Sequence, residues 1–185
     1  MAGGSQPLWG WHQLRRSWAF DLVARAGVRP GELVLDVGAG DGGLTDALLA
    51  AGATVVAVEL HRTRAQALRR RFAGRPVVVV QTDASDLRLP RRPFRVVANP
   101  PFSLLSPLLK RLLAPGSRLD AADLVVPRQA ARRWAGNTAP GARRWEATFE
   151  VTVRCTVPRH AFIPCPPRDA KVLQVRRWGL RPASR

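Results

Sequence analysis

Residues 33–45 read LVLDVGAGDGGLT, and this stretch decides the fold. The apolar run 33–37 is typical of a buried parallel strand, and it leads directly into a group of glycines. Residues 44–51 then have the composition of a helix that ends at Gly52. A strand, a tight glycine turn and a helix in this order predict a βαβ unit, in which the glycines let a ligand approach the backbone. By itself the stretch indicates only a nucleotide-like pocket.

Strand-like and helix-like segments alternate along the rest of the chain. The predicted strands are 33–37, 54–58, 77–80, 95–98, 122–126, 148–156 and 170–176. The predicted helices are 17–26, 44–51, 62–72 and 103–113. After Pro127 we expect a short helix and a loop, and the last two strands enclose a proline-rich loop. This pattern predicts an α/β fold with a mainly parallel seven-stranded sheet and helices on both faces.

Length and composition indicate a globular chain. Its 185 residues fall within the roughly 100–200 residues of an ordinary domain, and 46% of them are hydrophobic. We therefore expect a single catalytic domain over residues 1–185, with residues 1–16 as a basic and aromatic N-terminal segment. No apolar run suits a signal peptide or a membrane span, which favours a cytoplasmic protein without a membrane partner.

The charge of the chain is strongly one-sided, because 30 Lys and Arg residues against 13 Asp and Glu residues give a formal net charge of +17. Only Lys110 and Lys171 are lysines. A GC-rich genome explains the choice of arginine over lysine, but not the excess of one sign. A polyanion is the expected partner. Cys155 and Cys165 form no metal-ligand pattern with the three histidines, so no metal is expected.

Two acidic residues follow the next strands at positions where nucleotide-binding folds contact their ligands. Glu59 ends the second strand, where a carboxylate accepts hydrogen bonds from ribose hydroxyls. Asp83 follows the third strand, and its carboxylate suits an adenine amine, with the Ala84 amide near a ring nitrogen. A solvated glutamate and a turn-capping aspartate are the structural alternatives. The predicted pocket, for a dinucleotide or S-adenosylmethionine, contains Asp36, Gly38, Gly40, Glu59, Leu60, Asp83 and Ala84.

The most specific motif is Asn99-Pro100-Pro101-Phe102, which closes the fourth strand at the edge where such sheets bind ligands. Adenine N6 is a poor nucleophile because its lone pair is delocalised into the ring. The Asn99 side-chain oxygen and the Pro100 carbonyl can accept the two N6 hydrogens, which turns the lone pair toward a methyl donor. Phe102 offers the base a flat face. The motif predicts methyl transfer to adenine N6, although Asn-Pro-Pro is also a common turn.

The series DVGAGDGGLT, VVAVEL, QTDASD and VVANPPF resembles the ribosomal-RNA adenine N6-methyltransferases. That family includes macrolide-lincosamide-streptogramin resistance methylases and small-subunit dimethyladenosine transferases. The resemblance implies a Rossmann-like class I fold and S-adenosylmethionine as cofactor, which Asn99 also contacts. It extends to residues 10–14, where Gly10 and His12 would close over the cofactor. It also extends to residues 162–170, where Phe162 would stack on the target base.

The chain departs from the family pattern at three points. Trp11 stands where the family has glutamine. Pro100 stands where ribosomal enzymes commonly have isoleucine or leucine, and Asn-Pro-Pro-Phe is shared with DNA-adenine and protein-glutamine methyltransferases. The chain also stops after the last predicted strand, whereas relatives continue into a small helical domain. We therefore expect no C-terminal helical RNA-binding domain, as in short, arginine-rich resistance methylases of actinobacterial type.

Without that domain another surface must hold the RNA, and arginines beside tryptophans are the candidates, since guanidinium groups bind phosphate and indoles stack on unpaired bases. The predicted RNA-binding residues are Arg15, Arg16, Arg70, Arg128, Arg132, Arg133, Arg143 and Arg144. The predicted stacking residues are Trp9, Trp11, Trp134 and Trp145. The alternatives are a solvated helix face for each arginine and packing in the core for the tryptophans.

Together these features predict an S-adenosylmethionine-dependent methyltransferase acting on N6 of an adenine in 23S ribosomal RNA, near the macrolide site, that confers macrolide-type resistance. We expect a monomer that meets the large-subunit RNA before full assembly. Three alternatives stay open. They are methylation of another RNA, of DNA or of a protein glutamine; hydride transfer with NAD; and RNA binding without catalysis.

Overall fold

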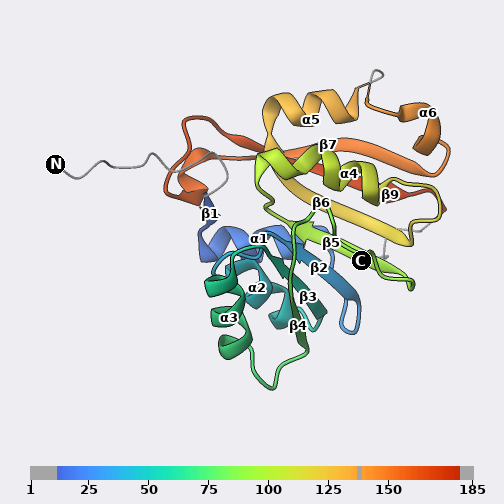
Figure 1. Ribbon diagram of the computed structural model, residues 1–185. Helices are drawn as coiled ribbons and strands as arrows, with labels where there is room; N and C mark the ends of the chain where they lie inside the picture. The colour runs from blue at the N-terminus through green and yellow to red at the C-terminus, as the bar shows by residue number, and fades with distance from the viewer. Residues whose placement is uncertain (1–11, 137–138, 180–185) are drawn as a thin grey trace.

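The computed structural model describes residues 12–136 and 139–179 (Figure 1). Its first half contains β1 (Gln13–Leu14), α1 (Arg16–Ala26), β2 (Leu33–Val37), α2 (Gly43–Ala50), β3 (Thr54–Glu59), α3 (Arg62–Arg71), β4 (Val77–Gln81) and β5 (Phe94–Ala98). Its second half contains α4 (Leu105–Leu112), β6 (Leu119–Pro127), α5 (Arg128–Ala135), α6 (Ala142–Trp145), β7 (Phe149–Val157), β8 (Phe162–Ile163) and β9 (Ala170–Arg177). Short 3₁₀ turns lie at Phe102–Leu104 and Arg159–Ala161.

Seven strands form the central sheet, in the order β4-β3-β2-β5-β6-β9-β7. Neighbouring strands from β4 to β6 are parallel, and β9 runs antiparallel to both β6 and β7. The predicted mainly parallel seven-stranded sheet is therefore confirmed. Because β2 has β3 on one side and β5 on the other, the strand order reverses at β2. In open α/β sheets, ligands bind outside the carboxyl ends of the strands at such a point.

Helices cover both faces of this sheet, as predicted (Figure 1). Successive residues of a strand point to opposite faces, and β2 follows this rule. Val34 packs in the cluster that contains the apolar sides of α1, α2 and α3, whereas Leu35 packs in the cluster that contains α4 and α5. Both side chains are fully buried, so each face of the sheet contributes to a closed core.

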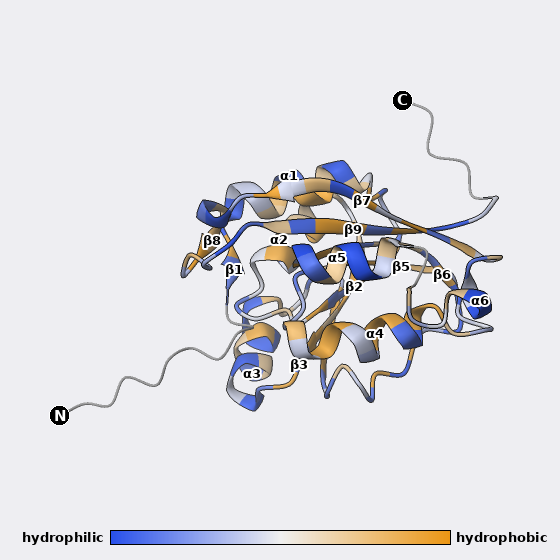
Figure 2. Cartoon of the chain, turned by 90° about the horizontal axis from the view of Figure 1, so that it is seen from above, coloured by the Kyte–Doolittle hydropathy of each residue, from blue (hydrophilic) through white to orange (hydrophobic). Residues whose placement is uncertain are grey.

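The basic segment after β6 forms α5 and α6, whose outward faces are largely hydrophilic (Figure 2). Trp134 and Trp145 point the other way and are only 1% and 8% exposed. The prediction that they stack on RNA bases is therefore wrong, because both indoles belong to the core. Trp9 and Trp11 lie outside the described residues. Within the described ranges, no helix is long and apolar enough to cross a membrane.

One pairing has no counterpart in the sequence-based prediction. The two-residue strands β1 and β8 pair in antiparallel register, with Gln13 opposite Ile163 and Leu14 opposite Phe162. Nearby, the Arg15 amide donates to the Ala161 carbonyl at 2.8 Å. The start of the described chain is thus fastened to the proline-rich loop that precedes β9.

Candidate active site

The glycine turn after β2 is in direct contact with the Asn99–Phe102 motif. Gly38 has a φ of +78°, and a Cβ atom added there would lie 2.9 Å from Cδ of Pro101. Real Cβ atoms are essentially never found so close to another heavy atom. A side chain at Gly38 would therefore strain the backbone and displace the motif turn. The two segments predicted to bind cofactor and adenine form one continuous surface.

Glu59 fixes the glycine turn from the next strand. It is 4% exposed, Oε2 accepts from the Gly40 amide at 2.9 Å and Oε1 accepts from the His61 amide at 2.9 Å. Each carboxylate oxygen keeps a second lone pair, so these bonds leave capacity for a ribose hydroxyl. Leu60 is 51% exposed beside this carboxylate and offers an apolar face at the carboxyl edge of the sheet.

Asp36 lies behind the turn rather than on its surface. It is 1% exposed, and its Oδ2 accepts a hydrogen bond of 2.6 Å from the Thr45 hydroxyl on α2. Burial, with a smaller contribution from the Glu59 charge, raises the Asp36 pKa to about 7. We predicted Asp36 as a cofactor-binding residue, and the correction is that it supports the site by joining β2 to α2.

Asp83 lies after β4, and its Oδ1 accepts from the Ser85 amide at 2.8 Å. Hydrogen bonds from the backbone and the side chain of Ser85 hold the pKa of Asp83 below its ordinary value, so the side chain is a carboxylate at neutral pH. The two oxygens of this carboxylate retain further lone pairs that suit an adenine amine. Ala84 is buried next to it. The assignment of both residues to the cofactor stays a prediction.

The Asn99 side chain has a fixed orientation. Its Nδ2 donates to the His12 carbonyl at 2.6 Å, and His12 Nδ1 in turn donates to the Pro164 carbonyl at 2.7 Å. With its amide nitrogen engaged, Asn99 presents Oδ1 as an acceptor. His12, predicted from the family pattern to close over the cofactor, also orients the side chain predicted to hold adenine. Gly10, the other residue of that prediction, lies outside the described residues.

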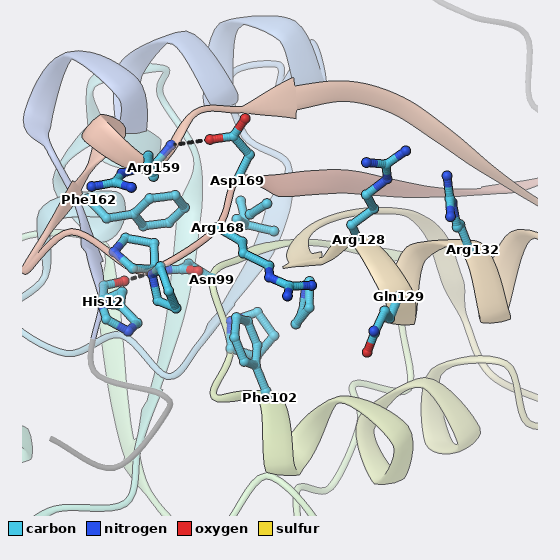
Figure 3. Close-up of a pocket in the computed structure, with 16 residues that line it drawn as sticks. His12, Asn99, Phe102, Arg128, Gln129, Arg132, Arg159, Phe162, Arg168 and Asp169 are labelled. Carbon is cyan, nitrogen blue, oxygen red and sulfur yellow. Dashed lines mark hydrogen bonds between the residues drawn. The ribbon is translucent and has the colours of Figure 1, made fainter. Parts of the chain in front are cut away.

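A cavity of about 960 Å³ opens beside Asn99 (Figure 3). Figure 3 shows Asn99 and His12 at one end, Phe162 and Phe102 on opposite sides, and the polar side chains of α5 at the other end. The lining residues come from the position before β1, the motif turn, β6, α5, and the segment from Arg159 to the start of β9: His12, Asn99, Pro100, Phe102, Val125, Pro127, Arg128, Gln129, Arg132, Arg159, Phe162, Pro166, Pro167, Arg168, Asp169 and Ala170. Aromatic walls and a directed acceptor suit a flat base with an exocyclic amine.

The structure brings four exposed arginines to this cavity. Arg128 and Arg132 were predicted as RNA-binding residues, whereas Arg159 and Arg168 were missed. Both missed residues flank the FIPCPP segment, from which Phe162 was predicted. Their proximity to this segment in the sequence could have identified them as candidates for RNA binding. Asp169 is the one acidic residue of the lining, and its Oδ1 accepts from the Arg159 amide at 2.8 Å.

The other predicted arginines do not line the cavity. Arg15 donates from Nε to the His160 carbonyl at 2.9 Å, and Arg16 is paired with Asp46 at 3.1 Å. The remaining four are exposed on α3, α5 and α6: Arg70, Arg133, Arg143 and Arg144. Within the described part of the chain, no group of three or more His, Cys, Asp or Glu side chains is arranged to hold a metal ion.

The match to a known family covers most of the chain. The profile of the ribosomal RNA adenine dimethylases matches residues 18–179. The chain belongs to this family. S-adenosylmethionine is the cofactor of the family, which decides between the two ligands that the glycine turn allowed. The predicted class I methyltransferase fold is confirmed.

The similar proteins include enzymes named for RNA of the small ribosomal subunit and for 23S RNA. Ribosomal RNA small subunit methyltransferase A of Thermosynechococcus vestitus is 36% identical over 181 residues, covering 90% of this chain and 68% of that protein. The mycinamicin-resistance protein MyrB of Micromonospora griseorubida is 39% identical over 148 residues, covering 78% and 46%. The 23S rRNA methyltransferase ErmE has a crystal structure with a TM-score of 0.78 and 28% identity, covering 92% and 72%. The chain thus spans about half to two thirds of the length of these curated relatives.

Proposed function

We propose that this chain transfers a methyl group from S-adenosylmethionine to N6 of an adenine in 23S ribosomal RNA near the macrolide site. The observation that carries the proposal is the orientation of Asn99. Its amide nitrogen is bound by the His12 carbonyl, so its oxygen is the group presented to the cavity between Phe102 and Phe162. A side-chain acceptor between two aromatic faces is the arrangement that adenine N6 requires.

The target adenine would lie with its ring between Phe102 and Phe162. Asn99 Oδ1 and the Pro100 carbonyl accept one N6 hydrogen each, which localises the nitrogen lone pair and directs it out of the ring plane. No general base is needed for the attack, because the proton on N6 becomes acidic once the nitrogen is methylated. An adenine reaches such a pocket only when it is unpaired or flipped out of its stack.

The cofactor supplies an electrophilic methyl group on a sulfonium. The residues that fit it are those of the glycine turn and the neighbouring strand ends. Gly38 and Gly40 form the turn at the carboxyl edge, and Glu59 retains lone pairs for ribose. Leu60 and Asp83 suit the apolar face and the amine of the cofactor's adenine. Since Gly38 also contacts Pro101, this placement brings the methyl donor next to the target pocket.

Charge and likeness to relatives support ribosomal RNA as the substrate. Arg128, Arg132, Arg159 and Arg168 surround the cavity and suit the phosphates on either side of a flipped nucleotide. The likeness to MyrB and ErmE favours the large subunit. Methylation there would remove amine hydrogens from the macrolide site and add bulk, which is the basis of resistance. The relatives named as small-subunit enzymes make 16S ribosomal RNA the second candidate.

Mapping the modified nucleotide tests the proposal. Purified protein and radiolabelled cofactor are incubated with one substrate at a time: 23S RNA, 16S RNA, DNA or a release factor. Primer extension then locates the modified adenine, and macrolide susceptibility is measured in cells that express the protein. We expect label in 23S RNA, reduced at least roughly 100-fold in Asn99→Ala by the loss of the N6 acceptor. Label in 16S RNA alone would favour the second candidate, and label in DNA or the release factor alone would refute both.

A further inference from the structure

Gln13 of β1 joins the two halves of the site. In the orientation that its neighbours require, its Nε2 donates to Asp41 Oδ2 at 2.6 Å and its Oε1 accepts from the Asp41 amide at 3.3 Å. The same side-chain amide lies 3.1 Å from where a Cβ of Gly40 would be. Gln13 therefore rests on the glycine turn and binds both a backbone and a side-chain group of one residue there.

Asp41 is itself a central residue of that turn. Its Oδ1 accepts from the Gly43 amide at 3.1 Å, at the start of α2, and its carbonyl accepts from Arg71 of α3 at 2.6 Å. The preceding amide, that of Gly40, is held by Glu59. A change in the conformation of the glycine turn would therefore move Asp41, and Asp41 is the residue to which Gln13 is hydrogen-bonded.

On its other side, the segment that contains β1 contacts two residues predicted to bind the target base. The His12 carbonyl, next to Gln13, binds the Asn99 amide nitrogen, and Leu14 is paired with Phe162 across the two-stranded sheet. The acceptor for N6 and one aromatic face are therefore both positioned by the residues that flank Gln13. A two-residue strand pair has little stability of its own, so its position depends on such side-chain contacts.

We propose that Gln13 is a positioning residue that transmits cofactor binding at the glycine turn to the target-adenine pocket. Cofactor contacts that order the turn also fix Asp41, which holds Gln13 and with it β1, Asn99 and Phe162. This inference rests on the proposed function, since it assigns the cofactor to the glycine turn and the base to the cavity. It adds a physical link by which the pocket is assembled when the methyl donor is present.

Hydrogen exchange measured by mass spectrometry tests the link without RNA. In the parent protein, S-adenosylmethionine is expected to slow exchange in peptides of the glycine turn and also in those of β1 and β8. In Gln13→Ala, protection of the glycine turn is expected to persist while the added protection of β1 and β8 is lost. Gln13→Lys, which can donate to the Asp41 carboxylate, is expected to restore it. Asp21→Ala on α1 serves as the control.

Steady-state methylation provides the second measurement. Gln13→Ala is expected to lower kcat about 10-fold with little change in KM for the cofactor, and Gln13→Ala/Asp41→Ala is expected to be no worse than the poorer single variant. Full protection of β1 and β8 together with parental kcat in Gln13→Ala would overturn the inference. If the cofactor failed to protect the glycine turn of the parent protein, the proposed function would fail instead, so the two failures are distinguishable.

Discussion

Two features require a glycine at position 38, a positive φ and a close contact with Pro101, and Gly38→Ala compared with a control separates their effects. Gly38 has a φ of +78°, and Gly74 has nearly the same conformation, with a φ of +75°. A Cβ at Gly74 meets no atom within 4 Å, whereas at Gly38 it would lie 2.9 Å from Pro101 Cδ. Gly74→Ala is therefore a matched control that introduces the backbone strain without the steric clash.

The expected magnitudes follow from these two differences. A left-handed conformation costs a residue with a Cβ about 1–2 kcal/mol, so both variants should lose that much stability, or about 2–8 °C in Tm for a chain of this size. At Gly38 the contact is also about 0.6 Å shorter than an ordinary carbon–carbon contact of roughly 3.5 Å. The motif turn must move by a comparable distance, and displacements of this order at a reacting group lower kcat about 10- to 100-fold.

Differential scanning fluorimetry and methylation of 23S RNA at saturating cofactor measure the two effects. We expect Gly74→Ala to lose stability and keep its kcat, and Gly38→Ala to lose both. A Gly38→Ala protein with the kcat of the Gly74→Ala control would refute the expectation that a side chain at Gly38 displaces the motif turn.

Three further predictions concern charge, titration and packing. Arg168→Ala should weaken RNA binding and reduce the slope of log affinity against log salt by about one unit, measured by fluorescence anisotropy, with exposed Arg118→Ala as a control that keeps the parental slope. Burial raises the Asp36 pKa to about 7, so the folded state retains a proton that the unfolded chain releases near its ordinary value of 3.8. The contribution of this group to the free energy of unfolding is complete below about pH 4 and is lost as the pH rises to about 7. Asp36→Asn should remove this pH dependence, measured by urea unfolding. Trp134→Ala should cost about 3–5 kcal/mol of unfolding free energy, and an unchanged urea midpoint would contradict the core assignment.

The parallel part of the fold was predictable because local pattern and tertiary environment agree there. Strand 33–37 was predicted with its observed ends, since an apolar run followed by glycine leaves few alternatives. The sequence of α5 also contains the pattern of a half-buried helix, but Trp134 was interpreted as a stacking residue. Ala131 and Trp134 are three residues apart and share one helix face, so the indole packs inward while the neighbouring arginines face solvent. Proximity of a tryptophan to arginines in sequence says nothing about which face it occupies.

The β1–β8 pair could not be predicted from local sequence. Each strand has two residues, too few to show an alternating pattern, and about 150 residues separate them. The contact that orients Asn99 is also invisible in the sequence, because its acceptor is the backbone carbonyl of His12. The motif thus predicts which residues would contact the target base, but it does not show how their side chains are held in place.

Gly38 has a steric reason to be glycine that the sequence analysis did not include. A glycine in this turn suggests a backbone that a ligand approaches closely, but at Gly40 a Cβ would lie 3.1 Å from the Gln13 side-chain amide. At Gly38 the atom that excludes a side chain belongs to the protein itself, in the turn that carries the adenine motif. In the proposed arrangement, Gly38 therefore lies between the site for the methyl donor and the site for the acceptor. A transfer reaction depends on the distance between these sites, and either site alone would tolerate a wider one.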